Sequence, residues 1–123
     1  MANDIIKFSY NWNNKLNNKA FTTIRRHNPQ KYRIGNQFII ELNGEKKGAA
    51  ILQEKRVFKI DQLNEFMSFI DTGYNRDKTT EILNRMYKGI DLKNTFFDLC
   101  LLVYVGREKT KEKEIQQKLE LVI

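Results

Sequence analysis

The chain is poor in the residues that build disulfides, metal sites and membrane spans. It has one cysteine, one histidine and one proline among 123 residues. A lone Cys100 cannot form an internal disulfide, and one cysteine with one histidine does not make a typical metal site. The longest apolar run, "FFDLCLLVYV" at 96–105, is interrupted by Asp98 and is shorter than the roughly 18 residues that cross a bilayer. We therefore expect no metal, no cofactor and no membrane span, and Cys100 as a buried thiol.

The N-terminal sequence favours an intracellular protein. "MANDIIKFSY" has an acid where a signal peptide needs Lys or Arg, and no long apolar segment follows. We expect a cytoplasmic location on this basis. The length and the ordinary balance of 41% hydrophobic and 30% charged residues suit a single globular domain. We predict that domain over residues 1–106, followed by a charged C-terminal helix or tail at 107–123.

Positive charge is concentrated in the N-terminal half of the chain. Residues 1–60 carry 12 Lys and Arg against 4 acids, a net +8, whereas residues 61–123 carry 10 against 11, a net −1. Six of the basic residues lie between Lys15 and Arg33, with no acid among them. Clustered cations neutralise phosphates and release counterions, so this stretch predicts an anion-binding surface. The alternative is a solvated basic edge, because net charge governs solubility before it governs function.

Hydrophobic periodicity predicts an α+β fold with helices inserted before the last strand. Strands are expected at 4–10, 20–26, 36–42, 49–60 and 95–105, with the turn at 43–48 closing a hairpin, and a polar turn or short helix at 11–18. Two helices are expected, one capped by Asp61 and one at 76–88, separated by a turn at 71–75. The apolar side chains at helix or strand spacing are assigned to the core: Phe66, Met67, Phe69, Met86, Phe96 and Phe97.

Several stretches follow one another in the order of a known domain family. "LNNKAFTTIR" (16–25) is similar to an element with the pattern Gly-x-Lys-Thr-x-Thr/Glu-x-Arg that enters a second strand, and "KYRIGNQFII" (31–40) is similar to the opening of the next strand. "IDQLNEFMSFIDTGY" and "ILNRMYKG" resemble inserted helices, and "FFDLCLLVYV" resembles a final barrel strand. Together these residues resemble the ASCH domains of the PUA-like superfamily over most of residues 5–105. The resemblance implies a small PUA-like (ASCH-like) β-barrel with two inserted helices.

The resemblance also implies a set of catalytic positions. The small ASCH enzymes that hydrolyse acetylated cytidine use a Lys at the strand entrance, a Thr within the strand and a carboxylate after the first inserted helix. Their Thr corresponds to Thr23 and their carboxylate to Asp71. Their Lys corresponds to Ala20, so the adjacent Lys19 is the candidate if a bulge or the strand entrance supplies the missing step. Two further positions depart from the family: Asn18 replaces its Gly, and Asn36 replaces its strand-opening Asp.

Amide hydrolysis needs a nucleophile or activated water, a proton carrier and a donor to the oxyanion. Lys19, Thr23 and Asp71 could supply these, since a Lys in a partly dry pocket acts more readily as a base. The structural alternative makes Thr23 a strand former, Lys19 a solvated charge and Asp71 a helix-end residue.

Ligand binding requires fewer specific residues than amide hydrolysis. The candidate binding residues are Arg25, Arg26, Lys31, Tyr32, Arg33 and Tyr74. The cations can reach phosphates, and Tyr32 or Trp12 offers a face on which an unpaired base stacks, worth roughly 1–3 kcal/mol. Arg25 can make bidentate contacts. The alternative is a solvated rim, with Tyr32 in the core and Tyr74 as a turn aromatic.

We therefore predict that a cleft between the 20–26 strand and the 71–75 turn binds RNA, single-stranded nucleic acid or a nucleotide. Hydrolysis of an acetylated or related modified cytidine is the second hypothesis. The third is a small protein that blocks a nucleic-acid enzyme through its basic face, which would make a protein the partner.

Overall fold

Five strands and two α-helices make up the part of the chain that the structure describes, residues 4–107 of a computed structural model. The strands are β1 (Asp4–Phe8), β2 (Ala20–Arg26), β3 (Gln37–Leu42), β4 (Glu45–Lys59) and β5 (Phe96–Arg107), and the helices are α1 (Glu65–Thr72) and α2 (Arg76–Met86). Three short 3₁₀ segments join them: η1 (Trp12–Asn17), η2 (Ile60–Gln62) and η3 (Leu92–Asn94). The predicted α+β class is confirmed. The helix or tail predicted beyond Arg107 lies outside the described residues.

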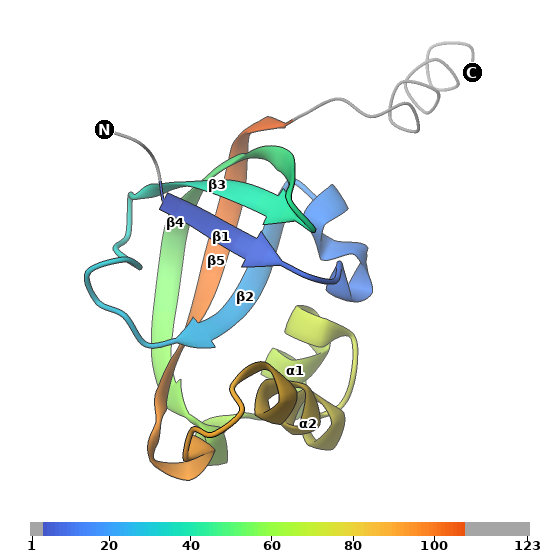
Figure 1. The fold of residues 1–123 in the computed structure, drawn as a ribbon, viewed down its shortest axis with the longest axis vertical. Helices are drawn as coiled ribbons and strands as arrows, with labels where there is room; N and C mark the ends of the chain where they lie inside the picture. Colours follow the sequence, from blue (N-terminus) through green and yellow to red (C-terminus); the bar gives the residue numbers. More distant parts are fainter. Residues whose placement is uncertain (1–3, 108–123) are drawn as a thin grey trace.

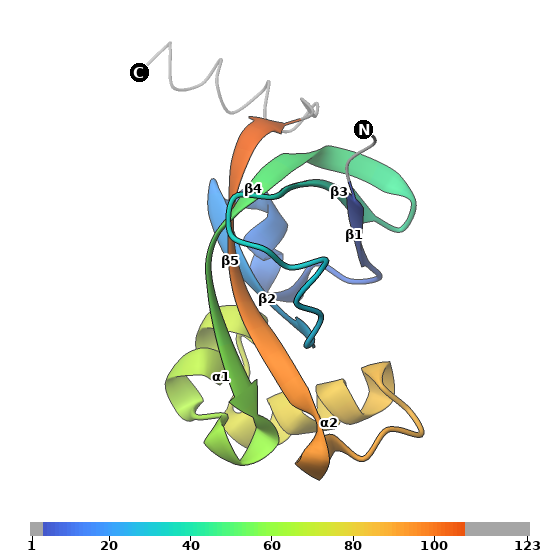
Figure 2. The same ribbon diagram turned by 90° about the vertical axis from the view of Figure 1, so that its left-hand side faces the viewer.

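The strands form one curled sheet with the order β1-β3-β4-β5-β2. β1 pairs with β3 in parallel, and the other neighbours are antiparallel. Figures 1 and 2 show the sheet bending into a half-barrel, with the edge strand β1 passing in front of β5 and β2 in Figure 1. Both α-helices lie together at the lower end of the sheet. No helix within residues 4–107 is long and apolar enough to cross a membrane.

Irregularities in the strand pairing allow the sheet to curl. The register shifts between Ile40 and Glu41 in β3, and at two places in β4. Such bulges bend a strand and increase its twist. Gly48 in β4 has a φ of 152°, and a Cβ at this position would collide with the backbone oxygen of Gly106 in β5. Only glycine therefore allows the two strands to approach so closely here.

Alternation along the strands divides the core into two clusters. The inner cluster fills the half-barrel and consists of Ile6, Phe8, Leu16, Phe21, Tyr32, Phe38, Ile40, Ala50, Leu52, Cys100, Leu102 and Tyr104. The second cluster lies between the sheet and the helices and consists of Ile24, Phe58, Leu63, Leu83, Leu92 and Phe97. Phe21 and Ile24 of β2 belong to different clusters because they lie on opposite faces of the strand. The predicted burial of Cys100 is confirmed.

Helix α1 differs from its prediction at its start and in the face that it buries. It begins after Asn64, whose Oδ1 accepts the backbone N–H of Met67 at 2.8 Å, whereas residues around Asp61 form a 3₁₀ turn. Its buried side chains are polar: Ser68, Asp71 and Thr72. Because these face inward, Phe66 is 74% exposed. The core assignment from sequence is wrong for four side chains that lie on the surface, two of them in α1 and one each in α2 and β5: Phe66, Phe69, Met86 and Phe96.

Candidate functional site

A pocket opens where the two edge strands of the half-barrel face each other, and we call it the seam pocket. Its volume is about 80 Å³. It is lined by Lys7, Phe8, Ser9, Tyr10, Trp12, Lys15, Thr23, Ile24, Arg25, Asp71, Thr72, Ile82, Leu83 and Met86. These residues come from β1, η1, β2 and both helices, so only the complete fold assembles the pocket. It lies between β2 and the end of α1, where the sequence predicts a cleft.

A buried ion pair forms one wall of the seam pocket. Lys15 Nζ lies 2.9 Å from Asp71 Oδ1 and also donates to the Asp71 backbone oxygen at 2.9 Å. Thr22 Oγ1 donates to the same carboxylate oxygen at 2.9 Å. Burial lowers the pKa of Lys15, an effect that Asp71 opposes and nearby Arg25 reinforces. The cluster ties η1, β2 and the last turn of α1 together.

Arg25 supplies a cation that a ligand can reach. Its Nε donates to Thr23 Oγ1 at 2.9 Å, and its guanidinium carbon lies 4.6 Å from the centre of the Phe8 ring. No carboxylate within residues 4–107 lies within ion-pairing distance of it. A guanidinium held by a ring and a neutral hydroxyl keeps donors for an anion. The charged residues that line the pocket are three cations, Lys7, Lys15 and Arg25, and one acid, Asp71.

A second buried carboxylate lies beside the basic stretch. Asp98 is fully buried, its Oδ1 lies 2.7 Å from His27 Nδ1, and its Oδ2 accepts the backbone N–H of Asn28 at 3.2 Å. Strand register places Asp98 opposite Arg25. The stretch from Lys15 to Arg33 contains no acid in the sequence, but in the folded protein Asp71 and Asp98 lie beside it, although they come from distant parts of the chain.

The structure brings three of the predicted residues together and separates the others. Thr23, Arg25 and Asp71 line the seam pocket. Lys19 is exposed and does not line it, and its backbone oxygen accepts the N–H of Tyr104. Lys15 occupies the place beside Asp71 that the resemblance implied for Lys19.

The remaining candidates lie outside the seam pocket. Tyr32 is only 6% exposed and packs against Phe38, so the expectation that its ring stacks on a base is wrong. Arg26, Lys31 and Arg33 lie at the end of β2 and in the loop after it. Tyr74 is 45% exposed and lines a neighbouring pocket. Of the cations between Lys15 and Arg33, only Lys15 and Arg25 line the seam pocket.

Sequence reasoning missed Lys15 and Thr22. Nothing in the linear spacing relates Lys15 to Asp71, because 56 residues separate them. An indirect signal was the stripe formed by Ser68, Asp71 and Thr72, which are spaced to share one face of a helix. A polar stripe that is buried needs hydrogen-bond partners, and a nearby Lys and Thr are suitable ones.

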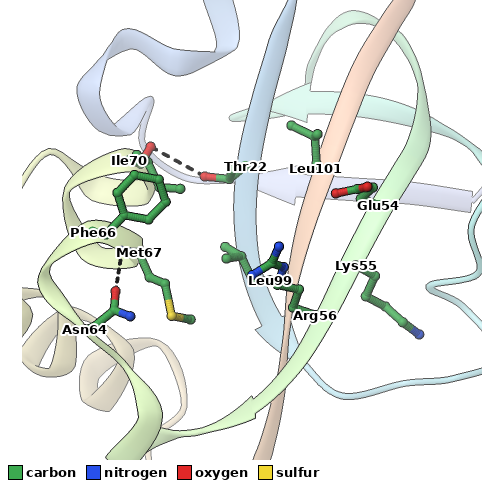
Figure 3. Close-up of a pocket in the computed structure, with 10 residues that line it drawn as sticks. All are labelled: Thr22, Glu54, Lys55, Arg56, Asn64, Phe66, Met67, Ile70, Leu99 and Leu101. Atoms are coloured by element: carbon green, nitrogen blue, oxygen red, sulfur yellow. Dashed lines mark hydrogen bonds between the residues drawn. The ribbon is translucent and has the colours of Figure 1, made fainter.

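Two further cavities flank this region. The first, which we call the amide pocket, has a volume of about 280 Å³ and is lined by Tyr10, Asn11, Trp12, Asn13, Asn14, Thr72, Gly73 and Tyr74. The second, the outer groove, has a volume of about 300 Å³ and is mostly apolar. Figure 3 shows Phe66, Met67 and Ile70 of α1 on one side of this groove and Leu99 and Leu101 of β5 on the other.

Comparisons with known proteins leave the family unassigned. No protein-family model matches the chain, and no curated protein or solved structure matches it significantly. The similarity to ASCH domains therefore stays a prediction from the residues. Within residues 4–107 no three His, Cys, Asp or Glu side chains are grouped as a metal site would require.

Proposed function

We propose that the protein binds RNA, another single-stranded nucleic acid or a nucleotide in the seam pocket of a PUA-like, ASCH-like fold. The order of the elements supports the fold, since the helices are inserted between β4 and β5 of a curled sheet as the resemblance implies. The balance of three cations to one acid supports an anionic ligand. The rings of Tyr10 and Trp12 in the same pocket, which are not buried, support a ligand with a flat base.

The observation that carries this proposal is the state of Arg25. It lines the pocket without a carboxylate partner among residues 4–107, and Thr23 and Phe8 hold its side chain. A guanidinium can make two parallel hydrogen bonds to a phosphate. These two contacts hold the side chain in place before a ligand binds, which reduces the entropic cost of binding.

Salt-dependent binding to short single-stranded RNA and DNA tests the proposal. We expect affinity at low salt that falls as salt rises, and Arg25→Met should weaken binding and reduce the slope of log K against log salt by about 0.7 if one phosphate contact is lost. Arg56→Met is the matched control, because Arg56 is exposed and lines the outer groove instead. Absence of binding at low salt, or equal effects of the two substitutions, would refute the proposal.

Hydrolysis of acetylated cytidine is the second candidate function. The observation that favours it is the burial of Lys15 beside Thr23 and Asp71 in one pocket, with a lowered pKa for the Lys15 amine. A lysine whose pKa is lowered gives up its proton more readily and can serve as a base. The Thr23 hydroxyl is the nucleophile in this candidate, as the resemblance implies. The catalytic residues of this candidate are Lys15, Thr23 and Asp71, with Lys15 in the role that the resemblance implied for Lys19.

Incubation with acetylated cytidine, followed by chromatography of the products, tests this second candidate. Release of cytidine should be lost in Thr23→Val, which keeps the shape of a buried side chain and removes its hydroxyl. Lys19→Ala should retain full turnover, because Lys19 does not line the pocket. If the wild-type protein releases no cytidine, hydrolysis of this substrate is excluded and binding remains the proposal.

A further inference from the structure

The amide pocket is continuous with the seam pocket. Tyr10, Trp12 and Thr72 line both of them. The two differ in charge: the seam pocket contains three cations, whereas no charged side chain lines the amide pocket. A ligand that occupied both would therefore need an anionic part and a neutral polar part next to each other.

Three aromatic rings border the amide pocket. The Trp12 ring centre lies 4.6 Å from that of Tyr10 and 6.2 Å from that of Tyr74. Tyr10 is 57% exposed and Tyr74 is 45% exposed. Both rings thus leave much of their surface open to solvent at the mouth of a pocket, where they can receive another flat group.

Two asparagines line the pocket in a backbone conformation that costs free energy. Asn13 and Asn14 have φ angles of 57° and 52°, in the left-handed region. Gly73 allows the end of α1 to approach them, because a Cβ on Gly73 would lie 3.0 Å from Asn13 Cγ. The side chains of Asn13 and Asn14 make no hydrogen bond within residues 4–107. Each amide therefore keeps its donors and its acceptor for a ligand.

We propose that the amide pocket is a second nucleotide subsite, so that the ligand is a single strand of at least two nucleotides rather than a free mononucleotide. This inference rests on the proposed function of the seam pocket. A base in the amide pocket stacks on Tyr74, which lines this pocket and not the seam pocket, and bonds through its edges to the asparagine amides. The absence of charge on these walls suits a base, while the cations of the seam pocket suit the phosphate. Shared walls allow adjacent nucleotides of one strand to fill both.

Binding of ligands of increasing length tests the second subsite. Trp12 is the single tryptophan of the chain and lines both pockets, so its fluorescence reports on either. We expect a tetranucleotide of single-stranded RNA to bind at least about tenfold more tightly than adenosine monophosphate, in line with one added stacking contact. Tyr74→Ala should bring the ratio of the two affinities close to one, whereas Tyr74→Phe, which keeps the ring, should preserve it.

Phe66→Ala is the matched control, because it also removes an exposed ring but in the outer groove, and it should leave the ratio unchanged. Equal affinities for both ligands, or a ratio that Tyr74→Ala does not alter, would overturn the second subsite and leave the proposed function intact. If neither ligand binds at low salt, the proposed function fails and this inference fails with it.

Discussion

Removing one member of the buried Lys15–Asp71 pair should destabilise the protein more than removing both. The two residues are 4% and 5% exposed, and their charged atoms lie 2.9 Å apart. The test uses Lys15→Met, Asp71→Asn and the double substitution. Methionine keeps the apolar length of the lysine, and asparagine keeps an oxygen that can accept the hydrogen bond from Thr22.

The expected size follows from the geometry of the pair. At 2.9 Å and an effective dielectric constant of about 20, the attraction is about 6 kcal/mol. Desolvation of the two ions costs several kcal/mol each, so the intact pair adds little net stability. A single substitution leaves one buried charge uncompensated and should cost about 3–5 kcal/mol. The double substitution removes both charges, so the coupling energy should be at least about 2 kcal/mol.

The lowered pKa of Lys15 determines whether stability rises or falls with pH. Because burial lowers the pKa of Lys15 below its ordinary 10.5, the folded state loses this proton at a lower pH than the unfolded state. This contribution to stability therefore rises with pH up to about 10.5 and is lost as pH falls through the folded pKa. In Asp71→Asn the carboxylate no longer favours the charged amine, so the variant should gain more stability than the wild type as the pH rises toward 10.5. Lys15→Met should lack the effect.

Urea unfolding followed by circular dichroism measures all four proteins. The exposed pair Arg85–Glu81 is the control, and the corresponding cycle there should show no measurable coupling. Effects of Lys15→Met and Asp71→Asn that add to within about 0.5 kcal/mol would show that the two charges do not interact in solution, and would contradict the buried pair.

Three further predictions follow from the described residues. Phe66→Ser should leave the urea midpoint almost unchanged, whereas Leu63→Ala, at a side chain 2% exposed, should cost about 2–5 kcal/mol; similar losses would contradict the assigned burial. Gly48→Ala should lower the melting temperature more than Gly44→Ala, because only the former adds a Cβ that collides with β5; equal shifts would argue against the close approach. Burial raises the pKa of the Cys100 thiol from 9 to about 12, so a thiol reagent at pH 8 should label Cys100 only after the protein unfolds. The stability that the buried thiol contributes is present below pH 9 and should be lost between pH 9 and 12. Rapid labelling of the folded protein would refute the burial.

Strand β2 is an element whose limits were predicted correctly from the pattern of neighbouring residues. Its predicted limits, 20–26, agree with the structure, and Thr23 and Arg25, which the pattern assigns to one face, both line the seam pocket, although Ile24 from the other face also lines it. Alternation with period two determines which side chains share a face, whatever the rest of the fold does. The same reasoning could not show that Lys19 lies outside the pocket, because that depends on where η1 packs.

Helix α1 shows where local pattern failed. Apolar periodicity favoured burial of Phe66, but the helix turns a polar stripe inward. Thr72 Oγ1 lies 2.7 Å from Thr79 Oγ1 of α2, and the Asp71 carboxylate is bonded to Lys15 and Thr22. Burial of polar groups is tolerated when every group has a partner, and these partners lie in other elements of the structure.

The sequence by itself determined the α+β class, the hairpin of β3 and β4, the two faces of β2 and the burial of Cys100, because these depend on neighbouring residues and on the period of the backbone. The tertiary structure alone decided that Lys15 pairs with Asp71, that Tyr32 is buried, and that the amide pocket adjoins the seam pocket. These features join segments far apart in the chain. They exist only once the sheet has curled and the helices have packed against β2, since no local spacing encodes a contact across 56 residues.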